Sequence, residues 1–169
     1  MSKSKIEWTE STWNPVTGCN KISEGCDNCY AERMAKRLKA MGQQNYINGF
    51  EVACHPHMLD APLKWKKSNM VFVNSMGDVF HEKVPLDFIK HVFGVMNIAD
   101  QHFYQVLTKR AKRLLELSEM IKWDSHIWMG VTVESKTFKY RIDYLRKTPA
   151  KIKFLSLEPL LGSLGELNL

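Results

Sequence analysis

The sequence predicts a single α/β domain built around a parallel sheet. From residue 70 onward, short apolar runs of strand length alternate with amphipathic stretches of helix length. The apolar runs are nonpolar almost throughout, as in "MVFV" and "HIWMGV", whereas half-exposed antiparallel strands alternate apolar with polar residues. Strands of this kind, each followed by a helix, are typical of a parallel sheet covered by helices.

The first third of the chain is expected to contain one extended segment and one helix. The segment "TWNPVTGC" (12–19) is extended because Asn14 precedes a proline, which disfavours helical backbone. The stretch "YAERMAKRLKAMG" (30–42) predicts a helix that ends at Gly42. Residues 43–69 show no helical stripe, so we expect a connector with a short strand at 50–53 and one helical turn.

The remaining chain contains four predicted strands and three predicted helices. The strands are expected at 70–78, 103–110, 126–135 and 152–162, and the helices at 85–99, 111–121 and 136–147. With the upstream segment, this makes about five strand-helix units. We therefore expect one domain over residues 1–169 with no linker.

Composition restricts the class of protein. The chain has 169 residues and is 44% hydrophobic, which is typical of a globular domain with a real core. No apolar run is long enough for a membrane span, and the polar N-terminus does not resemble a signal peptide, so we expect a cytoplasmic protein without membrane contact. The net charge of +6, from 24 Lys and Arg against 18 Asp and Glu, is consistent with a polyanionic partner.

Three of the four cysteines lie close together in "TGCNKISEGCDNCYAE". Cys19, Cys26 and Cys29 are spaced C-x6-C-x2-C, and Cys54 stands apart. In a reducing cytoplasm such a group is better interpreted as metal ligands or catalytic thiols than as disulfides. Two metal sites fit: a zinc ion with His55 or His57 as fourth ligand, or an iron–sulfur cluster whose three thiolates leave one iron open.

Polar residues, glycines and cysteines stand at the carboxyl ends of the extended segment at 12–19 and of the four strands predicted after residue 69. Ligands of parallel α/β folds bind at the carboxyl ends of the strands, so these residues are the candidates for a shared site. They are Gly18 and Cys19; Asn74, Ser75, Gly77 and Asp78; Thr108, Lys109 and Arg110; Thr132, Glu134 and Ser135; Ser156 and Glu158.

Several phrases in the same order along the chain resemble a known family. "IEWTESTWNPVTGCNKISEGCDNCYAERMAKRL", "VFVNSMGDVFHEKVP", "LTKRAKRL", "GVTVES" and "FLSLEPLLG" are similar to the phage-associated gp-thirty-seven/sixty-eight family. Its members are radical S-adenosylmethionine-like proteins of unassigned substrate.

The resemblance implies a partial TIM-like (β/α) barrel that holds a [4Fe-4S] cluster on Cys19, Cys26 and Cys29. Its open iron would bind S-adenosylmethionine, and an electron from a donor such as flavodoxin or ferredoxin would cleave the sulfonium to a 5′-deoxyadenosyl radical. The substrate is unknown, with nucleic acid or a nucleotide as the preferred class. Two features depart from the superfamily: its usual spacing is C-x3-C-x2-C, and this chain ends after the fifth predicted strand, as though C-terminally truncated by one strand-helix unit.

The resemblance also suggests roles for the strand ends. Gly77 and Asp78 in "SMGD" would meet the methionine amino group of the cofactor. Thr132, Glu134 and Ser135 would contact its ribose, since a carboxylate accepts bonds from vicinal hydroxyls. Ser156 and Glu158 are candidates at the fifth strand. Asp78 and Glu134 also suit a structural role as caps of the segments that follow them.

An alternative function needs no catalysis. The chain would be a zinc-stabilised nucleic-acid-binding phage protein, with His55 or His57 completing the zinc site and basic helices on the phosphates. If the substrate of the site is nucleic acid, Trp13, Trp65 and Trp128 are available for stacking. A third reading is a non-catalytic remnant that binds the cofactor poorly.

Overall fold

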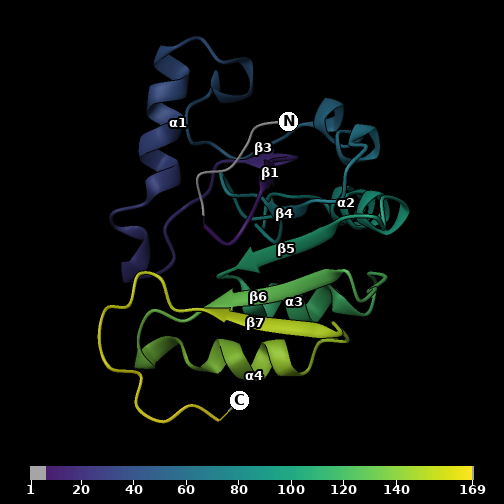
Figure 1. Cartoon of the computed structure of the whole chain (residues 1–169). Helices are drawn as coiled ribbons and strands as arrows, with labels where there is room; N and C mark the ends of the chain where they lie inside the picture. The colour runs from purple at the N-terminus through teal and green to yellow at the C-terminus, as the bar shows by residue number, and fades with distance from the viewer. Residues whose placement is uncertain (1–6, 169) are drawn as a thin grey trace.

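The computed structural model describes residues 7–168, and its centre is a five-stranded sheet in which every neighbouring pair is parallel. The strands lie in the order β1-β4-β5-β6-β7, which is their order along the chain (Figure 1). They are β1 (Ser11–Trp13), β4 (Met70–Val73), β5 (Phe103–Thr108), β6 (Ile127–Thr132) and β7 (Ile152–Ser156). The predicted parallel α/β fold is confirmed.

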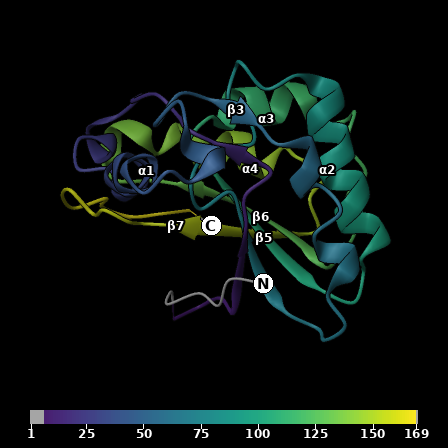
Figure 2. The same ribbon diagram turned by 90° about the horizontal axis from the view of Figure 1, so that it is seen from above.

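One α-helix joins each strand of this sheet to the next. They are α1 (Tyr30–Ala40), α2 (Leu86–Ile98), α3 (Ala111–Ser118) and α4 (Tyr140–Arg146). Helices α2, α3 and α4 lie on the same side of the sheet (Figure 2), as expected for sequential crossovers of one hand. Helix α1 stands beyond the arrowhead ends of the strands instead (Figure 1).

The structure differs from the sequence prediction mainly at the strand ends. The strand predicted at 70–78 stops at Val73, because Asn74 takes a left-handed backbone with φ 61° and turns the chain. The helix predicted at 136–147 starts with a 3-10 turn, Lys136–Phe138, before α4 begins. Thr108, Thr132 and Ser156 are the last residues of their strands, and the polar residues after them therefore lie outside the strands.

The connector at 43–69 contains more structure than one turn. Its strand β3 (Ala53–Cys54) begins three residues later than predicted and pairs antiparallel with β2 (Val16–Thr17). Three 3-10 turns surround it: Gln44–Tyr46, Pro56–Met58 and Pro62–Lys64. The connector thus ties the segment before the cysteines to the rest of the fold.

The main hydrophobic core lies between the sheet and helices α2–α4. Alternate strand residues point into it and are fully buried, among them Val71, Val106, Met129 and Val131. Helix α1 packs separately, in a small cluster of Ala31, Ala35 and Met76. No helix in the described part of the chain is long and apolar enough to cross a membrane.

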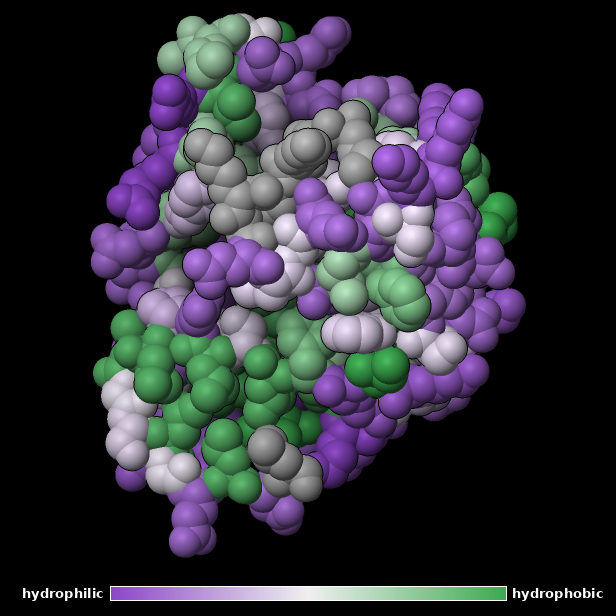
Figure 3. Space-filling view, viewed as in Figure 1, coloured by the Kyte–Doolittle hydropathy of each residue, from purple (hydrophilic) through white to green (hydrophobic). Residues whose placement is uncertain are grey.

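No helix of residues 7–168 covers the opposite face of the sheet (Figure 2). The other alternate residues, such as Phe72, Leu107, Trp128 and Phe154, lie there only partly buried. A hydrophobic patch extends over β7 and the segment that follows it (Figure 3), where Leu160 and Leu161 are exposed. This uncovered face is therefore accessible from solvent.

Candidate functional site at the carboxyl ends of the strands

Two glycines hold the start of the cysteine loop against the end of β4. Gly18 forms a parallel bridge with Gly77, and its N–H donates to the carbonyl of Met76 at 2.8 Å. A Cβ on Gly77 would lie 3.0 Å from the Gly18 oxygen and 3.1 Å from that of Val16. A Cβ on Gly18, whose φ is +81°, would lie 2.1 Å from the Glu51 oxygen. The close approach of these backbones requires glycine at position 18, and at position 77 it leaves little room for a side chain.

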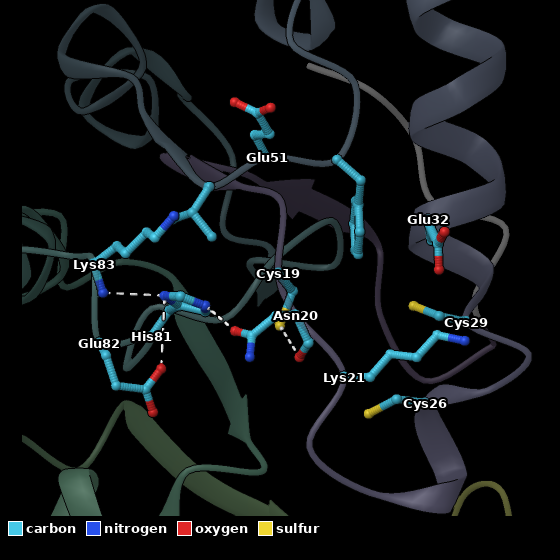
Figure 4. Close-up of a pocket in the computed structure, with 12 residues that line it drawn as sticks. Cys19, Asn20, Lys21, Cys26, Cys29, Glu32, Glu51, His81, Glu82 and Lys83 are labelled. Atoms are coloured by element: carbon cyan, nitrogen blue, oxygen red, sulfur yellow. Dashed lines mark hydrogen bonds and ion pairs between the residues drawn. The ribbon is translucent and has the colours of Figure 1, made fainter.

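The three clustered cysteines all line the same two cavities beside this loop. Cys26 ends a 3-10 turn and Cys29 directly precedes α1, and neither they nor Cys19 form a disulfide. The cavities measure about 810 and 180 Å³. In the larger one, Cys26 and Cys29 lie on the α1 side and His81 and Glu82 on the opposite side (Figure 4).

The thiols are spread around the cavities and do not converge on one point. Among residues 7–168, no three His, Cys, Asp or Glu side chains lie close enough together to hold a single metal ion.

Cys19 contacts a buried cation that is held by the end of β4. Arg110 Nη1 lies 3.3 Å from Cys19 Sγ and 3.1 Å from Asp78 Oδ2. Asp78 also accepts from Thr108 Oγ1 at 2.8 Å, and Arg110 Nε pairs with Glu82 at 3.0 Å. Asp78 therefore joins the ends of β4 and β5 and orients the arginine toward the thiol.

Cys26 also lies beside a cation that a carboxylate holds in place. Lys109 Nζ lies 3.7 Å from Cys26 Sγ and 3.0 Å from Glu134 Oε1. The same carboxylate oxygen accepts from Ser23 Oγ, and Oε2 is paired with Arg141 Nη1 at 2.7 Å. Glu134 and Arg141 are fully buried. The end of β6 is thus tied to the cysteine loop through Glu134.

The two thiols differ in acidity because their surroundings differ. Burial raises the pKa of Cys19 to about 11 despite the opposing charge of Arg110. Partial burial acts the same way on Cys26, but hydrogen bonds from the Ile22 backbone and from Ser23, with the charge of Lys109, outweigh it and lower the pKa of Cys26. Cys26 is therefore the more easily deprotonated of the two.

The acid at the end of β6 is kept ionised by its partners. Burial acts to raise the pKa of Glu134, but Ser23, Lys109 and Arg141 together lower it below its usual value. A permanent negative charge at this position balances the two cations that reach toward it.

On the far side of the larger cavity, His81 is held as a neutral ring. Its Nε2–H donates to Asn20 Oδ1, and its Nδ1 accepts from the Lys83 N–H at 3.1 Å. Burial and the charge of Arg110 lower its pKa. Asn20 Oδ1 also accepts from Arg110 Nη2 at 2.8 Å, so the histidine, the loop and the arginine form one network.

The structure brings some of the predicted site residues together and leaves others apart. Gly77, Asp78 and Thr132 line the smaller cavity with the cysteines. Glu134 lies behind them with both oxygens engaged, and Ser135 precedes the 3-10 turn after β6. Ser156 and Glu158 line a different cavity, on the uncovered face of the sheet.

The histidines considered as zinc ligands have other partners. His55 Nε2 bonds Thr17 Oγ1 at 2.8 Å, and His57 Nε2 bonds Asn45 Oδ1 at 3.1 Å. Neither histidine lines the two cysteine cavities. Of the tryptophans considered for stacking, Trp13 is buried and donates to the Met58 carbonyl, whereas Trp128 lies on the uncovered face.

Sequence reasoning missed Ser23 and Arg141. Ser23 carries no signal, since a serine in a polar loop is ordinary. Arg141 did offer one: it stands on the apolar stripe of its helical segment, three residues after Phe138 and four before Leu145. A charged residue at a position facing the core predicts a buried partner.

Comparison with known families gives one match. A family model described as "Protein of unknown function (DUF5131)" matches residues 3–169. The chain belongs to this DUF5131 family. Searches of curated proteins and of solved structures gave no match. Family membership thus assigns no activity to this DUF5131 chain, and its function has to be argued from the site.

Proposed function

We propose that the chain is a radical S-adenosylmethionine-type enzyme that holds a [4Fe-4S] cluster on Cys19, Cys26 and Cys29. One observation supports this above the others. The three thiols come from one loop and line the same cavities at the carboxyl ends of a parallel sheet, where the fourth cysteine, Cys54, does not reach. Three protein thiolates would leave one iron open for a small molecule.

The residues present fit a cluster better than a single ion. A structural zinc site needs four closed ligands, and neither His55 nor His57 lines the cysteine cavities, whereas a [4Fe-4S] cluster can be held by three thiolates with one iron left open. Lys109 favours the thiolate form of Cys26, which is the form that binds metal, and Arg110 offsets part of the effect of burial on the pKa of Cys19. Their positive charge also offsets the negative charge that three thiolates bring.

The remaining side chains of the site divide into two groups. A bound cluster would supply one electron to the sulfonium of S-adenosylmethionine. Thr132 and the backbone at Gly77 line the cavity and are the candidates to bind that cofactor. Asp78 and Glu134 are already engaged with Arg110 and Lys109, so their role is to hold these cations in place.

Other parts of the proposal follow from the fold. Sequential parallel strands with helices on one side are compatible with a partial (β/α) barrel whose interior is the uncovered face. The net charge of +6 suits a nucleotide or nucleic-acid substrate. Flavodoxin or ferredoxin is the proposed electron donor.

Turnover of the cofactor tests this function. The chain is reconstituted anaerobically with iron and sulfide, reduced, and given S-adenosylmethionine, and 5′-deoxyadenosine is measured by liquid chromatography. We expect product from the wild type and from Cys54→Ala, and none from Cys26→Ala. Equal product from both variants, or none from a wild type that carries its cluster, contradicts the proposal.

A further inference from the structure

The uncovered face of the sheet holds a cavity that the cysteine site does not use. It measures about 380 Å³, and its lining includes Trp8, Gln105, Leu107, Trp128, Phe154 and Glu158. This volume lies within the range of about 300–1,000 Å³ that is typical of small-molecule sites. Leu107 also lines the smaller cysteine cavity, so the two spaces adjoin across one side chain.

Aromatic rings form part of the lining of this cavity, together with leucine side chains. The strand register sets Gln105 beside Trp128, and Phe154 beside Gly130. A Cβ on Gly130 would lie 2.5 Å from the Phe154 ring, so the glycine lets this ring lie across β6. Rings arranged in this way offer stacking surfaces to a planar ligand.

Two buried polar atoms in these walls have no partner within the described chain. They are the acceptor Oε1 of Gln105, a residue that is 8% exposed, and the donor Nε1 of Trp128. An unpaired buried polar atom costs stability, and a native structure that keeps two of them beside a cavity calls for an explanation. A ligand whose edge carries both a donor and an acceptor would satisfy both atoms.

We propose that this cavity binds a nucleobase, the ring of the substrate. Nucleobases combine a flat ring with adjacent donors and acceptors on one edge, and glutamine amides are suited to that edge. Glu158, an exposed residue of the lining, would accept from sugar hydroxyls. Binding of a nucleobase in this cavity does not depend on the cluster. That the bound base belongs to the substrate rests on the proposed function. A base bound here would lie next to the cysteine cavity.

Titration of the purified full chain with adenosine, guanosine, cytidine and uridine by calorimetry tests this proposal. We expect saturable binding of at least one nucleoside, weakened about tenfold by Gln105→Leu, which is the effect of one lost hydrogen bond. The same variant should unfold at an equal or higher urea concentration, because the unpaired acceptor is gone. Weaker nucleoside binding without a loss of stability would show that Gln105 acts in binding and not in holding the fold together.

Trp128→Phe keeps an aromatic ring but removes the donor, and should also weaken binding. Trp65→Phe is the matched control, since Trp65 packs against His102 away from this cavity and should bind as the wild type does. Absence of nucleoside binding, equal weakening by Trp65→Phe, or a Trp128-dependent dimer that buries this face in sedimentation overturns the proposal. The titration is carried out on the protein with and without the cluster. Absence of nucleoside binding can then be distinguished from absence of iron binding.

Discussion

Replacing Arg141 by leucine tests the buried charge network behind the cysteine loop. Arg141 and Glu134 are 1% and 0% exposed and lie 2.7 Å apart. Without the arginine, Glu134 Oε2 loses its partner in the protein interior, while Oε1 keeps Lys109. Breaking a buried pair from one side costs about 3 kcal/mol, a large part of a total stability of about 5–15 kcal/mol.

Urea unfolding followed by circular dichroism measures this loss. With a slope of about 2 kcal/mol per molar urea, the midpoint should fall by about 1.5 M. Arg146→Leu, on the same helix, removes an exposed pair with Asp143 and should cost less than about 1 kcal/mol. The double variant Arg141→Leu/Glu134→Leu should recover much of the loss. Equal midpoints for the Arg141 and Arg146 variants would refute this reasoning.

Two further predictions concern acid stability and the glycine bridge. Burial and the neighbouring His57 hold the pKa of His55 below its usual 6.5, so the unfolded chain binds more protons as pH falls below 6.5. Stability should then drop by up to about 1.4 kcal/mol per pH unit until His55 itself titrates. Urea unfolding at pH 7.5 and 5.5 should show the strongest reduction of this drop in His55→Gln and a weaker one in His57→Gln, because burial is the larger cause of the lowered pKa and His57 the smaller one. Gly77→Ala should lower the urea midpoint, because its Cβ meets backbone at 3.0–3.2 Å, whereas Gly94→Ala in α2 meets nothing within 4 Å and should add about 0.5–1 kcal/mol. A stabilising Gly77→Ala would show that the cysteine loop does not need its close approach to β4.

The sequence allowed the fold to be predicted where apolar strand segments alternate with helical stripes. Strands β4 to β7 are apolar on both faces or nearly so, and the helices between them carry clear apolar stripes. The hydrophobic period and the length of each segment were therefore sufficient to assign it as strand or helix. The connector at 43–69 was predicted poorly. Its short strand β3 exists only because β2 lies opposite it, and no local pattern reports such a distant pairing.

The sequence predicted where the candidate site lies but not which of its side chains contact one another. Parallel strands bring their carboxyl ends to one edge, so Asp78 and Thr132 could be assigned there from the chain alone. Which acid holds which cation depends on geometry: Glu134 is engaged by Lys109 and Arg141, whose distances in sequence differ widely. Glu158 follows a strand as well, yet it lines the uncovered face away from the cysteines.

Iron and acid-labile sulfide content after anaerobic reconstitution tests the central claim most directly. A [4Fe-4S] cluster on Cys19, Cys26 and Cys29 predicts about four iron and four sulfide ions per chain, with Cys54→Ala unchanged and each of the other three alanine variants depleted. A colourless protein that instead takes up one zinc ion per chain contradicts it.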